Sequence, residues 1–444
     1  MKTFRTFLLF LFSFHLGADE VLAQAEGNDT RVLSGDEAIL LAYRNNPELR
    51  LAEMELLRAE TRLRWAGRLP NPKLELSSAD DSLGLDENEQ NLGLGFSQSF
   101  PVTSRLQDEK LVRRAQIVLA RAEVAERRRA LAAEVDLATL KLAVERRQIE
   151  QSRELAAVNE EVAEYLRRQA ERGEASPLDV TQANLTGQTL AHQVEHAEAK
   201  ERALAISLNR LLGLEPGESI EIRRTLDLPE ARPNLRDSMD DVLRRRPDHL
   251  LALAEIDEAL ASLQLEQARC WEDVTTRLFV NWNREMDAPN GLERNTFVRL
   301  DVSFPLPLRD RNQEGVALAK LKRTRAEKAA AALRFRIRSE YEQAFRHRLA
   351  TWEFSSHAAG EILRLAEKNL ADSQGANRRG QTGYLQVHRA QEQLLESKST
   401  ALEALADYHF AAARLREVSG RYPAGQSGET EPSRPQPRTR NPQP

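Results

Sequence analysis

The sequence predicts a mostly α-helical protein in which one structural unit is written twice, each copy carrying two short β-strands suited to a membrane barrel. Charged residues make up 30% of the chain and aromatic residues 5%, a composition typical of long helices and coiled coils. Four sequence landmarks recur in the same order about 200 residues apart, which indicates a duplication. Short segments between the helices alternate apolar and polar residues, the pattern of strands with one face on lipid.

The charge distribution argues against a nucleic-acid-binding protein. The formal net charge is −5, and basic and acidic residues are interspersed, whereas a nucleic-acid site needs a basic face. The arginine triplets Arg127–Arg129 and Arg244–Arg246 are embedded among acids, and we interpret both as solvated helix faces. Cys270 is the sole cysteine, which excludes an internal disulfide framework.

The first residues have the pattern of a secretory signal. Lys2 and Arg5 precede the apolar run Phe7–Leu16, which is too short to span a bilayer, and Ala23–Ala25 gives a small-x-small cleavage pattern. We therefore predict a signal peptide over residues 1–25. No cysteine comes directly after this segment, so we expect no lipid on the N-terminus of the mature chain.

The duplicated landmarks define two repeats and a tail. They are Pro47 against Pro247, SFPVTSR from Ser99 against SFPLPLR from Ser303, ERGEASPLDVTQA from Glu171 against RRGQTGYLQVHRA from Arg378, and Leu211–Gly213 against Val418–Gly420. We place the first repeat at 26–227 and the second at 228–420. The tail 421–444 is rich in Pro, Gly, Ser and Arg, and its composition predicts disorder.

Each repeat is predicted to contain a helix, two strands and a long helical hairpin. In the first, a helix over 34–65 begins with a Ser34/Glu37 capping box. The other elements of this repeat are strands over 73–79 and 91–100 and a hairpin over 105–212, broken between 171 and 177. The second repeat gives a helix over 236–270, strands over 274–283 and 296–304, and a hairpin over 312–418, broken between 377 and 384.

The hairpin helices are long enough to predict coiled-coil packing. A 4-3 spacing of apolar residues predicts two seams. Their positions are Leu111, Ala115, Val118, Ala122 and Ala125 in the first hairpin, and Leu394, Ala401, Leu405, Tyr408, Ala412 and Leu415 in the second, with Lys398 as an exception.

The strands of the second repeat alternate most clearly. Apolar Val298, Leu300 and Val302 alternate with polar Arg299 and Asp301. In the preceding strand Arg277 lies on the polar side, where Phe279 breaks the alternation. An ordinary half-buried sheet would also alternate, but four strands alone cannot cover an apolar face, and a membrane tolerates no open strand edge. Three subunits would supply twelve strands, enough to close a barrel.

At this point the sequence resembles the TolC family of outer-membrane efflux channels, over about 34–420. The motifs that carry the resemblance are NPEL from Asn46, RRPD from Arg245, LPNPKLE from Leu69, the two SFP-x3-R turns, and the tips RGEASPLDV and RGQTGYLQV. The sequences LPNPKLE and FSQSFPVTSR resemble the heavy-metal, cobalt-zinc-cadmium branch of that family more closely than its drug-efflux branch.

The resemblance implies a homotrimer with a twelve-stranded outer-membrane barrel continued by an α-helical periplasmic tunnel. It further implies a passive exit duct, without cofactor, bound metal or catalytic residue, that works with a periplasmic adaptor (membrane fusion protein) and an inner-membrane RND-type pump. On this basis Arg277, Arg299 and Asp301 would face the barrel lumen. The gate and adaptor contacts would be Arg172, Gly173, Ser176, Leu178 and Asp179 on one tip and Arg379, Gly380, Thr382, Leu385, Gln386 and Arg389 on the other.

The sequence departs from the family pattern at the start of the last helix. Family channels carry acids at the start of the last helix, where this chain has Gln386 and Arg389, whereas Asp179 keeps the acid on the first tip. If Arg389 faces the lumen, three copies would form a cationic ring that disfavours cation passage through the closed channel.

Two other functions fit parts of the sequence. His192 and His196 match an H-x-x-E-H zinc-peptidase pattern, but the surrounding helix predicts no third ligand and no pocket, so we interpret the match as chance. The stronger alternative is a periplasmic coiled-coil scaffold or adaptor whose strands form a small soluble sheet.

Overall fold

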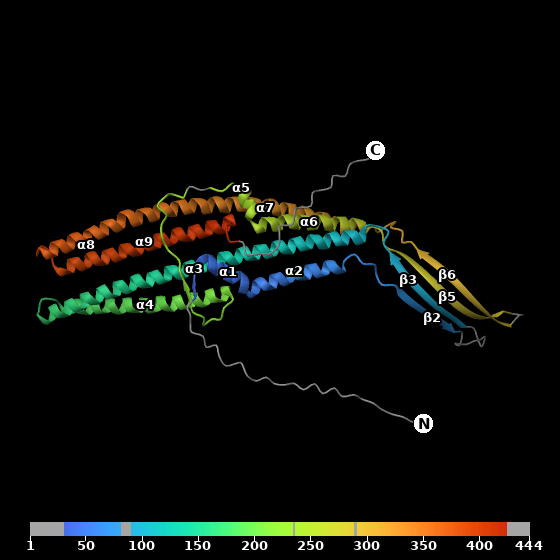
Figure 1. Cartoon of the computed structure of the whole chain (residues 1–444), viewed down its shortest axis with the longest axis horizontal. Helices are drawn as coiled ribbons and strands as arrows, with labels where there is room; N and C mark the ends of the chain where they lie inside the picture. The colour runs from blue at the N-terminus through green and yellow to red at the C-terminus, as the bar shows by residue number, and fades with distance from the viewer. Residues whose placement is uncertain (1–30, 81–89, 234–235, 288–290, 424–444) are drawn as a thin grey trace, which may run out of the picture.

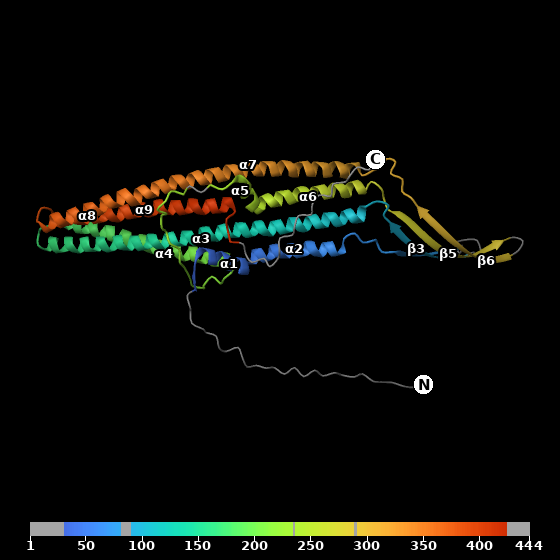
Figure 2. The same cartoon turned by 45° about the horizontal axis from the view of Figure 1, so that its top comes forward.

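The protein is an elongated molecule with a long bundle of helices at one end and a tilted β-sheet at the other (Figures 1 and 2). The computed structural model describes residues 31–80, 90–233, 236–287 and 291–423. The predicted signal peptide and most of the predicted tail lie outside these ranges.

The first half of the chain contains two short helices, two long strands and one long hairpin. The elements are β1 Arg31–Leu33, α1 Gly35–Asn45, α2 Pro47–Trp65, β2 Lys73–Asp80, β3 Gln90–Phe100, α3 Arg105–Glu171, α4 Pro177–Leu212 and β4 Ile220–Ile222. The 67 residues of α3 give a helix about 100 Å long.

The second half repeats this order. Its elements are α5 Met239–Arg245, α6 Pro247–Ala268, β5 Val274–Asp287, β6 Gly291–Ser303, α7 Gln313–His357, a π-helical turn Ala358–Ile362, α8 Leu363–Arg378 and α9 Tyr384–Ser419. The mostly helical fold with two hairpins and interposed strands confirms the predicted fold class.

The single helices predicted over 34–65 and 236–270 were wrong in one respect. Each is two helices, because Pro47 and Pro247 lack an N–H and force the preceding residue out of helical geometry. Asn46 and Arg246 adopt extended backbone there, and each proline becomes the first residue of the next helix. The Ser34/Glu37 capping box is confirmed, with Ser34 N donating to the Glu37 carboxylate at 2.8 Å.

The largest hydrophobic core lies where α1, α3 and the end of α4 meet. It includes Ile39, Leu49, Val135, Leu208 and Leu212, all almost fully buried. The strands β1 and β4 form a short parallel pair beside it, which the sequence did not predict. The middle of the molecule is thus where segments from both ends of the first half are fixed together.

The first predicted coiled-coil seam is not the buried line of this protomer. Leu111 and Val118 are exposed, whereas Val112, Ala120 and Val124 are buried on a neighbouring face of α3. The 4-3 pattern therefore located a helix correctly but assigned its buried face incorrectly. In the predicted second seam Tyr408 and Leu415 are buried.

The four long strands form one antiparallel sheet in the order β2-β3-β5-β6. Their pairing is regular from end to end, so side chains keep strict alternation between the two faces. None of the helices in the described ranges combines the length and the apolar character needed to cross a bilayer.

Candidate functional site

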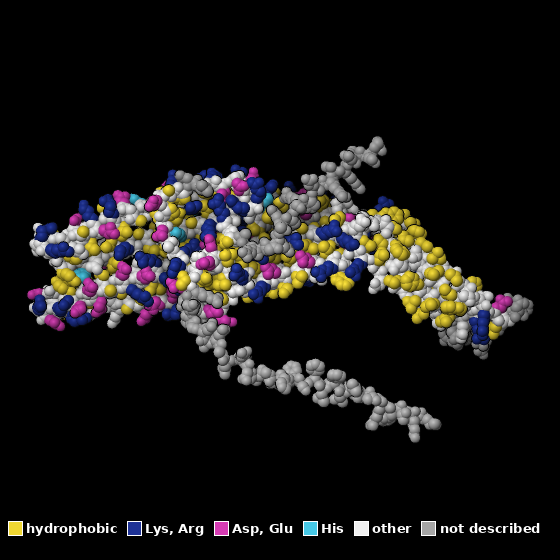
Figure 3. Space-filling view, viewed as in Figure 1, with side chains coloured by type: hydrophobic (Ala, Val, Ile, Leu, Met, Phe, Trp, Pro, Cys, Tyr) yellow, Lys and Arg dark blue, Asp and Glu magenta, His cyan; other side chains and the backbone are white. Residues whose placement is uncertain are grey.

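One face of the sheet is apolar and exposed. The register places the even-numbered residues of all four strands on this face. Its large exposed apolar members are Leu74, Leu76, Leu92, Leu94, Phe96, Phe100, Leu278, Trp282, Leu292, Val298, Leu300 and Val302. A space-filling view shows them as a nearly continuous apolar band over the strands, in contrast to the mixed charges of the helices (Figure 3).

The opposite face is polar and carries the three residues predicted to face the lumen. Arg299 Nε lies 3.1 Å from the Asp301 carboxylate, and Arg277 Nε lies 3.8 Å from Glu75. Ser97 donates to the same glutamate at 2.8 Å. The structure therefore brings Arg277, Arg299 and Asp301 onto one face, where each has a neighbour of opposite charge.

Phe279, which breaks the alternation, fits the polar face because of a glycine. Gly95 lies opposite it, and a Cβ on Gly95 would come within 2.3 Å of the Phe279 ring. The Arg299 guanidinium lies 5.2 Å from the centre of this ring, a cation–π arrangement. The glycine thus leaves the space in which an aromatic side chain lies flat among polar residues.

The first helical tip is stabilised by local interactions. Gly173 has a φ of +73°, a conformation that glycine adopts without a Cβ penalty. Ser176 accepts a hydrogen bond from Leu178 N and caps α4, and Asp179 lies in the first turn, where the helix dipole favours a negative charge. Arg172 ends α3 as its C-cap.

The second tip has fewer local interactions. Gly380 has a φ of +69°, like its counterpart, but the residue that caps α9 is Gly383, which has no side chain to accept a hydrogen bond. Thr382 lies immediately before this cap, and its carbonyl accepts from Asn377 Nδ2 at 2.9 Å. Leu385, Gln386 and Arg389 follow on exposed positions of α9.

An aromatic cluster missed by the sequence analysis connects the two hairpins near their tips. The rings of Tyr165 on α3 and Tyr384 on α9 have centroids 4.3 Å apart, and His388 packs edge-on against Tyr384 at 4.1 Å. His388 is buried, and burial lowers the pKa of its imidazole. The i, i+4 spacing of Tyr384 and His388 was the available signal, since it places both side chains on one helix face.

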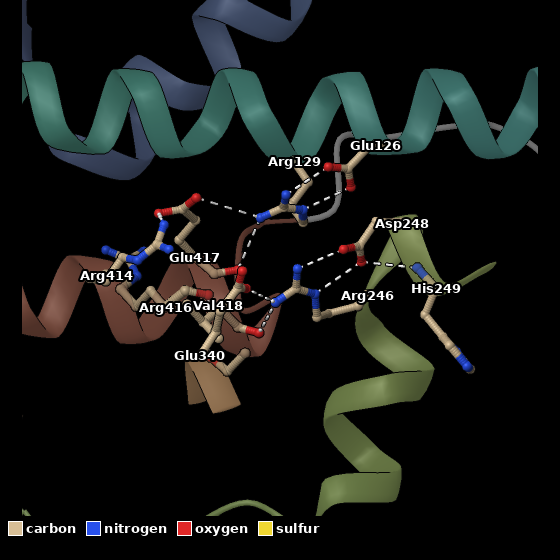
Figure 4. Close-up of polar contacts among 11 residues, drawn as sticks. Glu126, Arg129, Arg246, Asp248, His249, Glu340, Arg414, Arg416, Glu417 and Val418 are labelled. Carbon is tan, nitrogen blue, oxygen red and sulfur yellow. Dashed lines mark hydrogen bonds and ion pairs between the residues drawn. The ribbon is translucent and has the colours of Figure 1, made fainter. Parts of the chain in front are cut away.

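A buried ion cluster holds the bundle together near its middle. The Arg246 guanidinium makes paired hydrogen bonds to Asp248 at 2.6 and 2.9 Å, and it also donates to Glu340 and to the carbonyl of Val418 (Figure 4). Beside it, Arg129 on α3 pairs with Glu126 and donates to the Glu417 carbonyl at 3.2 Å. The cluster therefore joins α3 to α6, α7 and α9.

The interpretation of both arginine triplets as solvated was wrong for these two members. The Arg246 side chain is only 5% exposed and that of Arg129 13% exposed. Burial opposes ionisation of Asp248, but the hydrogen bonds and charge of Arg246 outweigh it, so the pKa of Asp248 lies below its ordinary value. Asp248 and Glu126 are close in sequence to their arginines, but the burial of the site depends on Glu340, Glu417 and Val418 from distant segments, which sequence reasoning missed.

His192 and His196 both lie exposed on α4, with Glu195 at 3.9 Å from His192. In the described parts of the chain, no three His, Cys, Asp or Glu side chains gather in a metal-binding cluster. The H-x-x-E-H pattern therefore has no third ligand among these residues.

The comparisons with known proteins agree with this architecture. Residues 38–214 match the family model described as outer membrane efflux protein. No curated protein matches the chain significantly.

Several solved structures have the same fold. CusC has 17% identity, with 90% of this chain and 95% of that chain covered and a TM-score of 0.70. The CmeC outer membrane channel of Campylobacter jejuni has 14% identity, coverage of 87% and 85%, and a TM-score of 0.71. The MtrE outer membrane channel of Neisseria gonorrhoeae in its open state has 17% identity, coverage of 87% and 88%, and a TM-score of 0.68. At these identities the likeness shows the fold.

Proposed function

We propose that this chain, of which residues 38–214 match the outer membrane efflux protein family, is a member of that family and works as a homotrimer whose sheets close into a twelve-stranded barrel. The chain is a non-enzymatic outer-membrane efflux channel that extends into the periplasm. In the proposed trimer it is the passive exit duct for substrates selected by an inner-membrane RND-type pump and handed over through a periplasmic adaptor. The match of residues 38–214 to this family supports the channel over the alternative of a periplasmic adaptor or scaffold.

The observation that carries the proposal is an apolar sheet face without a cover, on a sheet with two open edges. Leu76 is 75% exposed and Val298 71% exposed, on the first and last strands of the sheet. In this protomer β2 pairs only with β3 and β6 only with β5. Unpaired edges are costly in lipid, so the sheet needs copies of itself on both sides.

Closure by three copies also accounts for the polar face. A barrel of twelve strands encloses an aqueous interior, and the face with Arg277, Arg299 and Asp301 would line it. The charge pairs on this face would remain hydrated, which removes the cost of burying them.

The trimer is tested with the mature chain purified in detergent. Light scattering should give the mass of three chains, and planar bilayers containing the protein should show ion conductance. A chain that stays dispersed as a monomer without any amphiphile would contradict the proposal.

The two tips are the proposed contacts with the adaptor. Leu178 is 73% exposed and Leu385 42% exposed, so each tip presents an apolar side chain to solvent. The double variant L178S/L385S should still trimerise and conduct but should fail to restore export in a deletion strain. The control L365S removes a leucine whose exposure, 54%, lies between those of the two tip leucines, from α8 away from the tip, and should restore export.

We further propose that Arg389 faces the lumen of the closed end. It is exposed on the first turns of α9, between the buried neighbours His388 and Ala390, so its side chain points away from the buried face of the helix. Arg389→Asp should shift conductance in planar bilayers toward cation selectivity, because a ring of three cations becomes a ring of three anions. Arg364→Asp, an exposed charge reversal on α8, is the control; unchanged selectivity of Arg389→Asp would remove this residue from the gate.

The narrower proposal for the cargo is heavy-metal cations. It is supported by the wording of LPNPKLE and FSQSFPVTSR, whereas the likeness to CusC at 17% identity speaks for the fold. A deletion strain should become sensitive to cobalt, zinc or cadmium. Sensitivity to dyes with unchanged metal tolerance would exclude the heavy-metal branch.

A further inference from the structure

Two arginines lie side by side at the far end of the apolar sheet face. Arg284 on β5 and Arg294 on β6 are directly opposite in the register, and both belong to the even-numbered face. They lie at the end of the strands that is farthest from the helices, where a space-filling view shows basic side chains beyond the apolar band (Figure 3).

Their level along the strands matches a membrane interface. Trp282, 44% exposed, is the outward-facing residue immediately before Arg284. Tryptophan is typical of the boundary between hydrocarbon and headgroups in membrane barrels. Two residues further along a strand is about 7 Å, so the arginines would lie at the level of the headgroups.

Like charges directly opposite each other destabilise a strand pair unless something neutralises them. Among the described residues, no hydrogen bond or ion pair of either guanidinium is found, and the acids nearest along the strands point away. Glu285 and Glu293 pair with each other in the register on the opposite, polar face, where Asn283 donates to Glu285 at 3.2 Å. The register also places Asp80 on this row, with Gln90 of β3 between its backbone and that of Arg284.

We propose that Arg284 and Arg294 bind the phosphate groups of the anionic glycolipid that forms the outer leaflet of the outer membrane. The inference rests on the proposed function, because only the barrel with its helices in the periplasm places these strand ends at the outer leaflet. Two adjacent guanidinium groups match a phosphate, each donating paired hydrogen bonds to its oxygens. The phosphate neutralises the repulsion between them, and three copies give three such sites around the barrel.

The test compares two double variants of the full-length trimer in detergent. R284Q/R294Q removes both charges from the outward face, and R277Q/R299Q removes two from the same strands on the opposite face. Binding of diphosphoryl lipid A, measured by native mass spectrometry and by titration, should weaken roughly tenfold in the first variant and stay unchanged in the second. Lipid A without phosphates should bind both variants and the unaltered protein equally.

Equal binding of diphosphoryl lipid A by the unaltered protein and R284Q/R294Q would overturn the inference. Displacement of the lipid by inorganic phosphate at the same concentration would also overturn it, since it would indicate a simple anion site. The mass and conductance of each preparation are measured in parallel. A conducting trimer with equal lipid binding rejects only the lipid site, whereas a chain that forms no trimer rejects the proposed function and the lipid site together.

Discussion

Asn46 and Arg246 occupy equivalent positions in the two halves of the molecule. Both donate a hydrogen bond to the end of a hairpin helix, one from a neutral amide and the other from a charged guanidinium. Each is buried, each lies between two helices, and each is followed by a proline. Asn46 Nδ2 donates to the carbonyl of Leu211 at 2.9 Å, and Arg246 Nη1 donates to the carbonyl of Val418 at 3.1 Å. Each bond holds the C-terminal end of a hairpin helix, α4 in the first half and α9 in the second, against the break between the two short helices of the same half.

The difference lies in what else each side chain needs. The Asn46 amide also accepts from Leu49 N at 3.0 Å, so its main partners are backbone groups of its own half. Arg246 brings a charge into the interior and must be neutralised by Asp248 and Glu340. The neutral Asn46 amide finds its partners within its own half, whereas the Arg246 charge depends on carboxylates and, through Asp248, on Arg129 of the other half.

The largest expected effect on stability is the removal of the Arg246 side chain. Arg246→Ala should lower the free energy of unfolding in detergent by about 3 kcal/mol, because it empties a buried site and leaves the half-buried Asp248 carboxylate without its main partner. Asn46→Ala, the matched change in the first half, should cost about 1–2 kcal/mol. Equal losses in the two variants would show that the charge makes no difference between the halves.

A smaller effect should appear on acidification. The pKa of Asp248 is lowered in the folded protein, so its ion pair contributes its full stability above the ordinary value of 3.8 and loses it as the pH falls from that value through the lower pKa of the folded state. Unfolding measured over a series of acidic pH values should therefore show a steeper decline in the unaltered protein than in Asp248→Asn. Parallel curves would contradict this assignment.

The smallest expected effects concern the two tips. Ser176→Ala removes the cap of α4 and should cost about 1 kcal/mol, whereas Gly383→Ser offers α9 a cap it lacks and should gain a few tenths, about 0.3 kcal/mol. Gly383 has an extended backbone with open space where a Cβ would lie, so serine fits without strain. Hydrogen exchange at the two helix starts would measure both changes, and a loss of protection in Gly383→Ser would contradict the comparison.

Local signals in the sequence were sufficient for the parts of the fold that depend on neighbouring residues. The alternation in 296–304 predicted which side chains share a face of β6, because the strand period is set by the backbone alone. The glycines at 173 and 380 predicted the sharp helix ends for the same reason, since a positive φ is a property of one residue.

The contacts within the candidate site were harder to predict from the sequence than the secondary structure, because they join residues far apart in the chain. Arg277 and Asp301 were assigned to the polar face from their own strands, but the pairing of Arg277 with Glu75 joins residues far apart in sequence. The cluster of Tyr165, Tyr384 and His388 required the two hairpins to be packed together. The placement of Phe279 over Gly95 likewise required the register of β3 against β5.

By itself the sequence determined the order of the long helices and of the four long strands, the two faces of the sheet and the duplicated plan, because these follow from periodicity and from residues with restricted backbones. Only the tertiary structure decided which faces of α3 are buried, that β1 pairs with β4, and that Arg129 and Arg246 lie inside rather than in solvent. The sequence around an arginine looks the same whether its side chain is buried or exposed to solvent. Its burial depends on whether a carboxylate such as Asp248 and a carbonyl such as that of Val418 meet it in space.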